Sequence, residues 1–163
     1  MDARIESSKP RTMRGSEPAE TDHNVTTDDG LGLRILICDE EYLIALDGQA
    51  LLQEISGLAV DAVMPRDMTN VIEDKAFDLV LLDPESSNMN LGELLDQLMA
   101  REIAIVFGTV SPGSSETWVR SGIPTVEKPY EVNELLRAFS EALKDTQPLK
   151  ARAVAALVTG SGP

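Results

Sequence analysis

The chain has 163 residues, of which 42% are hydrophobic and only 4% aromatic, enough for one ordinary domain with a mainly aliphatic core. Its formal net charge of -14 repels nucleic acid and anionic membrane surfaces, so no direct partner of either kind is expected. The single cysteine, Cys38, and the single histidine, His23, exclude an intramolecular disulfide, Ser/His/Asp catalysis and zinc sites built from several histidines.

Composition divides the chain into three parts. Residues 1–32 are rich in Ser, Thr, Asp, Glu, Pro and Gly and lack hydrophobic periodicity, which predicts a disordered leader. Residues 33–145 carry the periodic pattern and are the predicted folded domain, and residues 146–163 form a weakly basic C-terminal tail in which an extra amphipathic turn and a frayed end are both open. With no long apolar run and no apolar signal-peptide core, a cytoplasmic location is expected.

Short apolar or β-branched runs alternate with helical patterns through the folded domain. Helices are expected near 41–55 and 130–144, with a shorter leucine stripe after Asp83. Between Thr109 and Gly122 the pattern leaves room for only about two turns, which predicts a short or mobile fourth helix. The alternation favours βαβ units and a buried parallel sheet. The expected strands are 33–38, 58–63, 77–82, 103–108 and 123–127, the last at a sheet edge because it contains Pro124.

Polar residues stand where four of these strands end. Asp39 and Glu40 end the first strand, Asp83 the third, Thr109 the fourth and Lys128 the fifth. Ligands of open parallel sheets bind outside the carboxyl ends of the strands, so these side chains are expected to converge. Taken one at a time, each could instead be a polar strand end, a helix N-terminus or a turn.

Together the strand ends match one kind of chemistry. Three crowded carboxylates repel one another unless a divalent cation lies among them, and their hard oxygens favour Mg2+. Asp83 could then act as the nucleophile towards a phosphoryl group, while Lys128 and Thr109 bind its equatorial oxygens. The sequence therefore predicts a Mg2+-dependent phosphoryl acceptor.

Four stretches resemble the receiver domain of bacterial two-component response regulators. The resemblance covers roughly residues 33–145 and keeps the family's order and spacing. The stretches are Arg34-Ile35-Leu36-Ile37-Cys38-Asp39-Glu40-Glu41, Phe77-Asp78-Leu79-Val80-Leu81-Leu82-Asp83, Val106-Phe107-Gly108-Thr109 and Glu127-Lys128-Pro129-Tyr130.

The resemblance implies a flavodoxin-like (CheY-like) α/β fold, doubly wound, with a five-stranded parallel sheet of order 2-1-3-4-5. Asp83 would be the phosphoacceptor, and Thr109 and Lys128 the switch hydroxyl and the phosphate-binding lysine. By the family pattern Glu40 ligates Mg2+ directly, Asp39 acts through water, and the main-chain carbonyl of Glu85 completes the protein ligands.

The chain also departs from the family. Thr125 stands where a switch Tyr or Phe is usual, Val110 stands where a small residue is common, and residues 84–88 replace the usual Met-Pro-Gly turn. The interval of 19 residues between Thr109 and Lys128 is short. Residues 105–109 are similar to the Phe-Ala-Thr-Gly stretch of alphaproteobacterial single-domain receivers that lack the switch aromatic.

These features predict a stand-alone response regulator, a phosphoprotein of a phosphorelay and not an enzyme, at most self-dephosphorylating. Its phosphoryl donor would be a sensor histidine kinase or a histidine phosphotransfer protein. After residue 145 only 18 residues remain, so a downstream protein partner is expected at region 110–135, and homodimerisation is open. The alternatives are a degenerate, unphosphorylated docking module and a haloacid-dehalogenase-type phosphatase with Asp83 as nucleophile.

Overall fold

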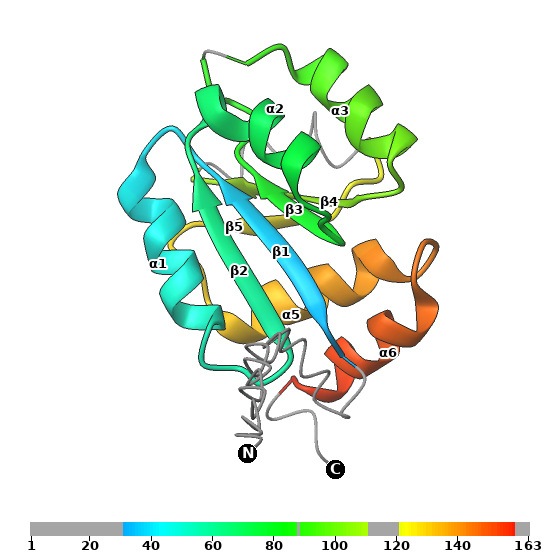
Figure 1. The fold of residues 1–163 in the computed structure, drawn as a ribbon. Coiled ribbons are helices and arrows are strands. Elements are labelled where there is room, and N and C mark those ends of the chain that lie inside the picture. The colour runs from blue at the N-terminus through cyan, green and yellow to red at the C-terminus, as the bar shows by residue number, and fades with distance from the viewer. Residues whose placement is uncertain (1–30, 88, 111–120, 159–163) are drawn as a thin grey trace, which may run out of the picture.

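The computed structural model describes residues 31–87, 89–110 and 121–158. Five strands form one parallel sheet in the order β2-β1-β3-β4-β5, which confirms the expected doubly wound α/β fold (Figure 1). The strands are β1 (Leu33–Cys38), β2 (Leu58–Val63), β3 (Leu79–Leu82), β4 (Ala104–Thr109) and β5 (Thr125–Glu127).

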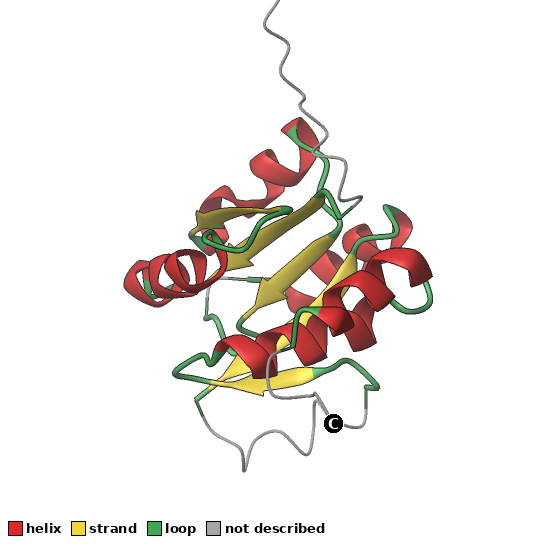
Figure 2. Ribbon diagram, turned by 90° about the horizontal axis from the view of Figure 1, so that it is seen from below, coloured by secondary structure: helices red, strands yellow, loops and turns green. Residues whose placement is uncertain are grey.

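Helices cover both faces of the sheet. The helices are α1 (Tyr42–Leu52), α2 (Pro65–Asp74), α3 (Leu91–Ala100), α5 (Val132–Leu143) and α6 (Pro148–Ala156). Helices α1 and α5 pack on one face with one apolar cluster, and α2 and α3 pack on the other with a second cluster. Figure 2 shows the sheet between these two helical layers.

The strand sequences explain this layered arrangement. Every residue of β3 and β4 is buried, as expected for aliphatic strands that contact helices on both faces of a parallel sheet. β5 has only three residues and lies at the edge. Pro124 directly precedes it, and its carbonyl accepts a hydrogen bond from the Phe107 N–H. The missing N–H of proline is tolerated at such a sheet edge.

Local signals mark where the helices begin. Pro65 occupies the first turn of α2, where a backbone N–H has no helical partner. Asn90 caps α3 by accepting a hydrogen bond from the Glu93 N–H, and the Glu131 carboxylate caps α5 by accepting one from the Asn133 N–H. These caps mark where the loops that follow β3 and β5 end and the next helices begin.

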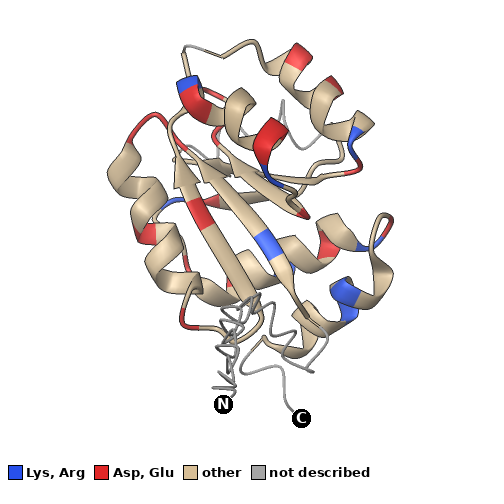
Figure 3. Cartoon of the chain, in the orientation of Figure 1, with Lys and Arg blue, Asp and Glu red and all other residues tan. Residues whose placement is uncertain are grey.

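The C-terminal tail contains a further helix, α6, which packs against α5. Of the open alternatives, the structure therefore has a helix rather than a frayed end within residues 148–156. Its buried face is Ala151 and Val154, followed by Val158, whereas Leu149 is 79% exposed. The basic residues of α6 stand out on a ribbon whose loops and other helices carry many acids (Figure 3).

Two sequence expectations lie outside the described residues. The disordered leader falls almost wholly within residues 1–30, and the short fourth helix falls within 111–120. Among the residues that are described, no helix is long and apolar enough to cross a membrane.

Candidate functional site

One ammonium group joins the ends of the first, third and fifth strands. Lys128 Nζ lies 2.5 Å from Asp39 Oδ2 and 2.7 Å from Asp83 Oδ2. Since both carboxylate oxygens contact the same nitrogen atom, both are within reach of a single cation. The sheet has therefore brought three of the predicted site residues together at its carboxyl edge.

Burial differs sharply within this ion-paired group. The side chains of Lys128 and Asp39 are 4% and 1% exposed, while that of Asp83 is 16% exposed. Burial lowers the pKa of Lys128, but its hydrogen bonds to Asp39 and Asp83 and their charges outweigh this effect and raise the pKa above the usual lysine value. Lys128 is therefore a fixed positive charge, and Asp83 is the carboxylate of the pair that solvent reaches.

Backbone hydrogen bonds hold each of these groups in place. Asp39 Oδ1 accepts a hydrogen bond from the Glu41 N–H, and Asp83 Oδ1 accepts one from the Glu85 N–H, both at 2.8 Å. The Lys128 N–H donates to the Thr109 carbonyl at 2.8 Å. Thr109, which is 2% exposed, thus ends β4 directly beside the residue that carries the ammonium.

Glu40 does not join the other two acids. Its Oε2 accepts hydrogen bonds from Ser87 N at 3.2 Å and from Ser87 Oγ at 3.1 Å, in the loop after β3. Accordingly, in the part of the chain that the structure describes, no three Asp, Glu, His or Cys side chains are grouped closely enough to hold a metal ion. The hard oxygens of Asp39 and Asp83 suit Mg2+, but the Glu40 side chain, which is hydrogen-bonded to Ser87, would have to turn to join them.

Tyr130 is a site neighbour whose placement sequence reasoning missed. A Cβ added at Gly108 would lie 2.2 Å from Tyr130 Oη, and one added at Gly48 would lie 3.3 Å from Tyr130 Cδ2. The ring therefore occupies a slot between β4 and α1 that two glycines leave open. Burial, followed by the charges of Asp39 and Asp83, raises the pKa of Tyr130. The available signal was Gly108, an unusual residue inside an otherwise bulky buried strand.

Thr125 and Cys38 are two further residues near the strand ends, one at the start of β5 and one at the end of β1. Thr125 begins β5, and its Oγ1 donates a hydrogen bond to the Ile123 carbonyl two residues earlier. Cys38 is 1% exposed, and burial, followed by the charges of Asp39 and Asp83, raises the pKa of its thiol to about 12. The cysteine is thus a buried, protonated packing residue.

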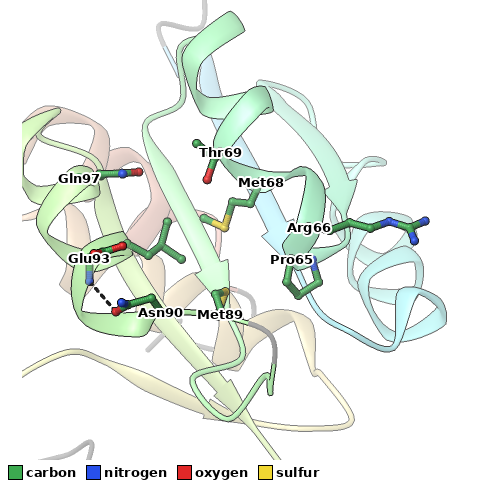
Figure 4. A pocket seen from close by; sticks show the side chains of 9 residues that line it. Pro65, Arg66, Met68, Thr69, Met89, Asn90, Glu93 and Gln97 are labelled. Carbon is green, nitrogen blue, oxygen red and sulfur yellow. Dashed lines mark hydrogen bonds between the residues drawn. The ribbon is translucent and has the colours of Figure 1, made fainter.

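A separate hollow of about 300 Å³ lies between α2 and α3 (Figure 4). Met68 and Thr69 line it from α2, Glu93 and Gln97 line it from α3, and the guanidinium of Arg66 points away from it. None of the strand-end residues that converge on Lys128 lines this hollow, so the two sites are distinct.

Solved structures show what this fold is similar to. SdrG from Sphingomonas melonis Fr1 is 27% identical, with 68% of this chain and 96% of that chain covered and a TM-score of 0.54. A two-component response regulator from Clostridium difficile is 20% identical over 71% of this chain and 98% of its own, with a TM-score of 0.57.

The chemotaxis protein CheY4 of Vibrio cholerae is 19% identical over 68% of this chain and 98% of its own, with a TM-score of 0.56. No protein-family model and no curated protein sequence matches the chain. The sheet order and these similarities show that the chain has the fold of the receiver domains of response regulators, and its strand-end residues lie at the carboxyl edge of that sheet.

Proposed function

We propose that Asp83 accepts a phosphoryl group from the phosphohistidine of a sensor histidine kinase or a histidine phosphotransfer protein. The observation that carries this proposal is the Lys128 ammonium, which contacts Asp39 Oδ2 and Asp83 Oδ2 at the carboxyl edge of the sheet. The side chain of Lys128 is almost completely buried, so its ammonium is fixed at this point, where it can bind phosphoryl oxygens.

Accessibility supports Asp83 rather than Asp39 as the acceptor. The side chain of Asp83 is 16% exposed and that of Asp39 is 1% exposed. An incoming phosphorus atom must approach a carboxylate oxygen in line with the bond that breaks. Only the more exposed carboxylate leaves room for such an approach from solvent.

The transfer is a single exchange of bonds. An Asp83 oxygen forms a bond to phosphorus while the bond from phosphorus to the donor histidine nitrogen breaks, and the electron pair stays with the imidazole. The product is an acyl phosphate on Asp83. The Lys128 ammonium then binds one phosphoryl oxygen, and the Thr109 hydroxyl donates a hydrogen bond to another.

Receiver domains generally bind Mg2+, and the donor set here fits that ion in its chemistry. Asp39, Asp83, Glu40 and the main-chain carbonyl of Glu85 would hold it. The ion supplies positive charge that offsets the gathering of carboxylates and phosphoryl oxygens. The Glu85 N–H already donates to Asp83 Oδ1, which brings this loop to the acceptor.

A similar protein supports a response to phosphoryl chemistry. The BeF3-activated conformation of SdrG is 26% identical, with 70% of this chain and 98% of that chain covered and a TM-score of 0.53. We propose the same kind of activation for this chain, with output by protein contact through region 110–135. Val110, which is 62% exposed beside Thr109, is the described residue of that region closest in sequence to the switch hydroxyl.

Intact-mass spectrometry with acetyl phosphate and Mg2+ tests the acceptor. The wild-type chain should gain one phosphoryl group, and Asp83→Asn should gain none, because an amide oxygen does not form the acyl phosphate. Asp61→Asn is the matched control, since Asp61 lies on β2, away from the carboxyl edge of the sheet, and forms an ion pair with the exposed Lys75. It should label like the wild type.

Three outcomes would decide against this function or against Asp83 as its acceptor. A wild-type chain that takes up no phosphoryl group would favour the unphosphorylated docking module instead. Steady release of phosphate from an ester substrate would favour the phosphatase alternative. An adduct that persists in Asp83→Asn would move the acceptor to another residue.

A further inference from the structure

The loop that carries the acceptor also binds a carboxylate from the first strand's end. Glu40 follows β1, and Ser87 lies four residues after Asp83. Glu40 Oε2 accepts two hydrogen bonds from Ser87, one from the backbone nitrogen at 3.2 Å and one from Oγ at 3.1 Å. One carboxylate oxygen therefore ties together two loops that are 47 positions apart in sequence.

This contact competes with the metal role proposed for Glu40. Asp39 and Asp83 converge on Lys128, whereas the Glu40 carboxylate is directed to Ser87. Among the described residues no three acids are grouped closely enough to hold a metal ion, so the Glu40 side chain must turn towards Asp39 and Asp83 before it can ligate the same cation, and the hydrogen bonds to Ser87 oppose that turn. The charge of Glu40 is also partly satisfied at Ser87, because hydrogen bonds to an ionised carboxylate are stronger than those between neutral groups.

We propose that Ser87 is a positioning residue that holds Glu40 away from the metal site, so that Mg2+ binding and release of the loop after β3 occur together. The inference rests on the proposed function, because it assumes that Glu40 serves a Mg2+ site. With the metal absent, the acceptor loop is tied to the end of β1. With Mg2+ bound, Glu40 turns to the ion and Ser87 is set free beside Asp83.

Isothermal titration calorimetry of the full chain with MgCl2 tests the competition. Ser87→Ala removes the Oγ donor and leaves the backbone donor, so Mg2+ affinity should rise about 2- to 10-fold, the range for one lost hydrogen bond. Ser86→Ala is the matched control. Ser86 is the adjacent serine, its buried hydroxyl has no hydrogen-bond partner among the residues that the structure describes, and its removal should leave the affinity unchanged.

A second variant, Glu40→Asp, distinguishes competition between Ser87 and Mg2+ for Glu40 from a local packing effect of Ser87→Ala. The side chain of Glu40→Asp is one methylene shorter and should not span the distance to Ser87. In that background Ser87→Ala should change the Mg2+ affinity by less than about 2-fold. The non-additive pair of substitutions would be the signature of a direct contact.

The results also distinguish the two proposals. If the wild type binds Mg2+ but Ser87→Ala binds it equally or more weakly, the positioning role is overturned while the phosphoacceptor site stands. If neither the wild type nor any variant binds Mg2+, the metal-dependent function fails and the inference fails with it. Tighter binding by Ser87→Ala, or binding by that variant alone, supports the competition.

Discussion

A single buried cation, Lys128, balances two carboxylates from other strands. Lys128 and Asp39 are almost completely shielded from solvent, with side chains 4% and 1% exposed. Charges in such surroundings are tolerated only when they are paired, because desolvation of each one is expensive. The residue that the proposed chemistry uses to bind phosphoryl oxygens is thus also the one that makes the folded site stable.

Removal of this cation should destabilise the fold. Lys128→Ala leaves Asp39 buried beside Asp83 without a counter-charge, and we expect the free energy of unfolding to fall by about 3 kcal/mol or more. Urea denaturation measures the change. Lys75→Ala is the control, because the 3.4 Å pair of Lys75 with Asp61 is about half exposed and should contribute less than about 1 kcal/mol. Equal effects of the two substitutions would contradict this account.

At the scale of elements, α1 and β4 are separated by the ring of Tyr130. The residue lies between Lys128 and the start of α5, and it packs against the α1 and α5 core cluster. Its hydroxyl occupies the space where a side chain at Gly108 would begin. The Tyr130 ring therefore packs against β4, the strand that ends at Thr109.

Gly108→Ala should disturb this contact. The added Cβ would lie 2.2 Å from Tyr130 Oη, and we expect a loss of about 1–3 kcal/mol in the free energy of unfolding. Tyr130→Phe in the same background should recover part of the loss, because it removes the oxygen but leaves ring carbons 3.0 Å away.

Gly92→Ala is the matched control for this experiment. Gly92 lies in α3, and the nearest atom to its added Cβ, Asn90 Oδ1, is 3.7 Å away. Alanine is the better helix former, so the substitution should be neutral or stabilising by up to about 1 kcal/mol. Additive effects of Gly108→Ala and Tyr130→Phe would show that the ring and the glycine are not in contact.

At the scale of the whole molecule, α6 closes the end of the sheet opposite the site. The Asp78 carboxylate just before β3 accepts hydrogen bonds from the Arg34 N–H, from Gln147 Nε2 and from Lys150 Nζ. Ser140 of α5 donates to the Ala151 carbonyl of α6 at 2.8 Å. The described tail is therefore joined to β1, β3 and α5, while the domain boundary at residue 145 stays a prediction.

A pair of substitutions tests whether α6 is an integral part of the fold. Val154 is 0% exposed in the main core cluster, and Leu149 in the same helix is 79% exposed. Val154→Ala should lower the free energy of unfolding by about 2 kcal/mol through lost burial and a cavity, and Leu149→Ala should change it by less than about 0.5 kcal/mol. Similar small effects in thermal and urea denaturation would mean that the helix is dispensable.

Much of the architecture could be predicted from local patterns. The expected strands 33–38 and 58–63 coincide with β1 and β2, and the remaining strands differ from expectation by at most two residues at an end. The alternation of apolar runs and helical patterns predicted a parallel sheet, and the strand order came from the resemblance to receiver domains; the structure confirms both. The expected strands began two residues too early at β3 and β5, because the apolar runs already start at Phe77 and Ile123, before the strands themselves begin.

The sequence by itself determined that Asp39, Asp83, Thr109 and Lys128 end parallel strands, because strand patterns and chain order place these ends at one edge of a sheet. Only the tertiary structure decided where their side chains go. It paired Lys128 with both aspartates, turned Glu40 to Ser87, set Tyr130 against Gly108 and buried one face of α6. These contacts join residues far apart in the chain, and periodicity describes which face a residue occupies but not which distant atom its side chain reaches.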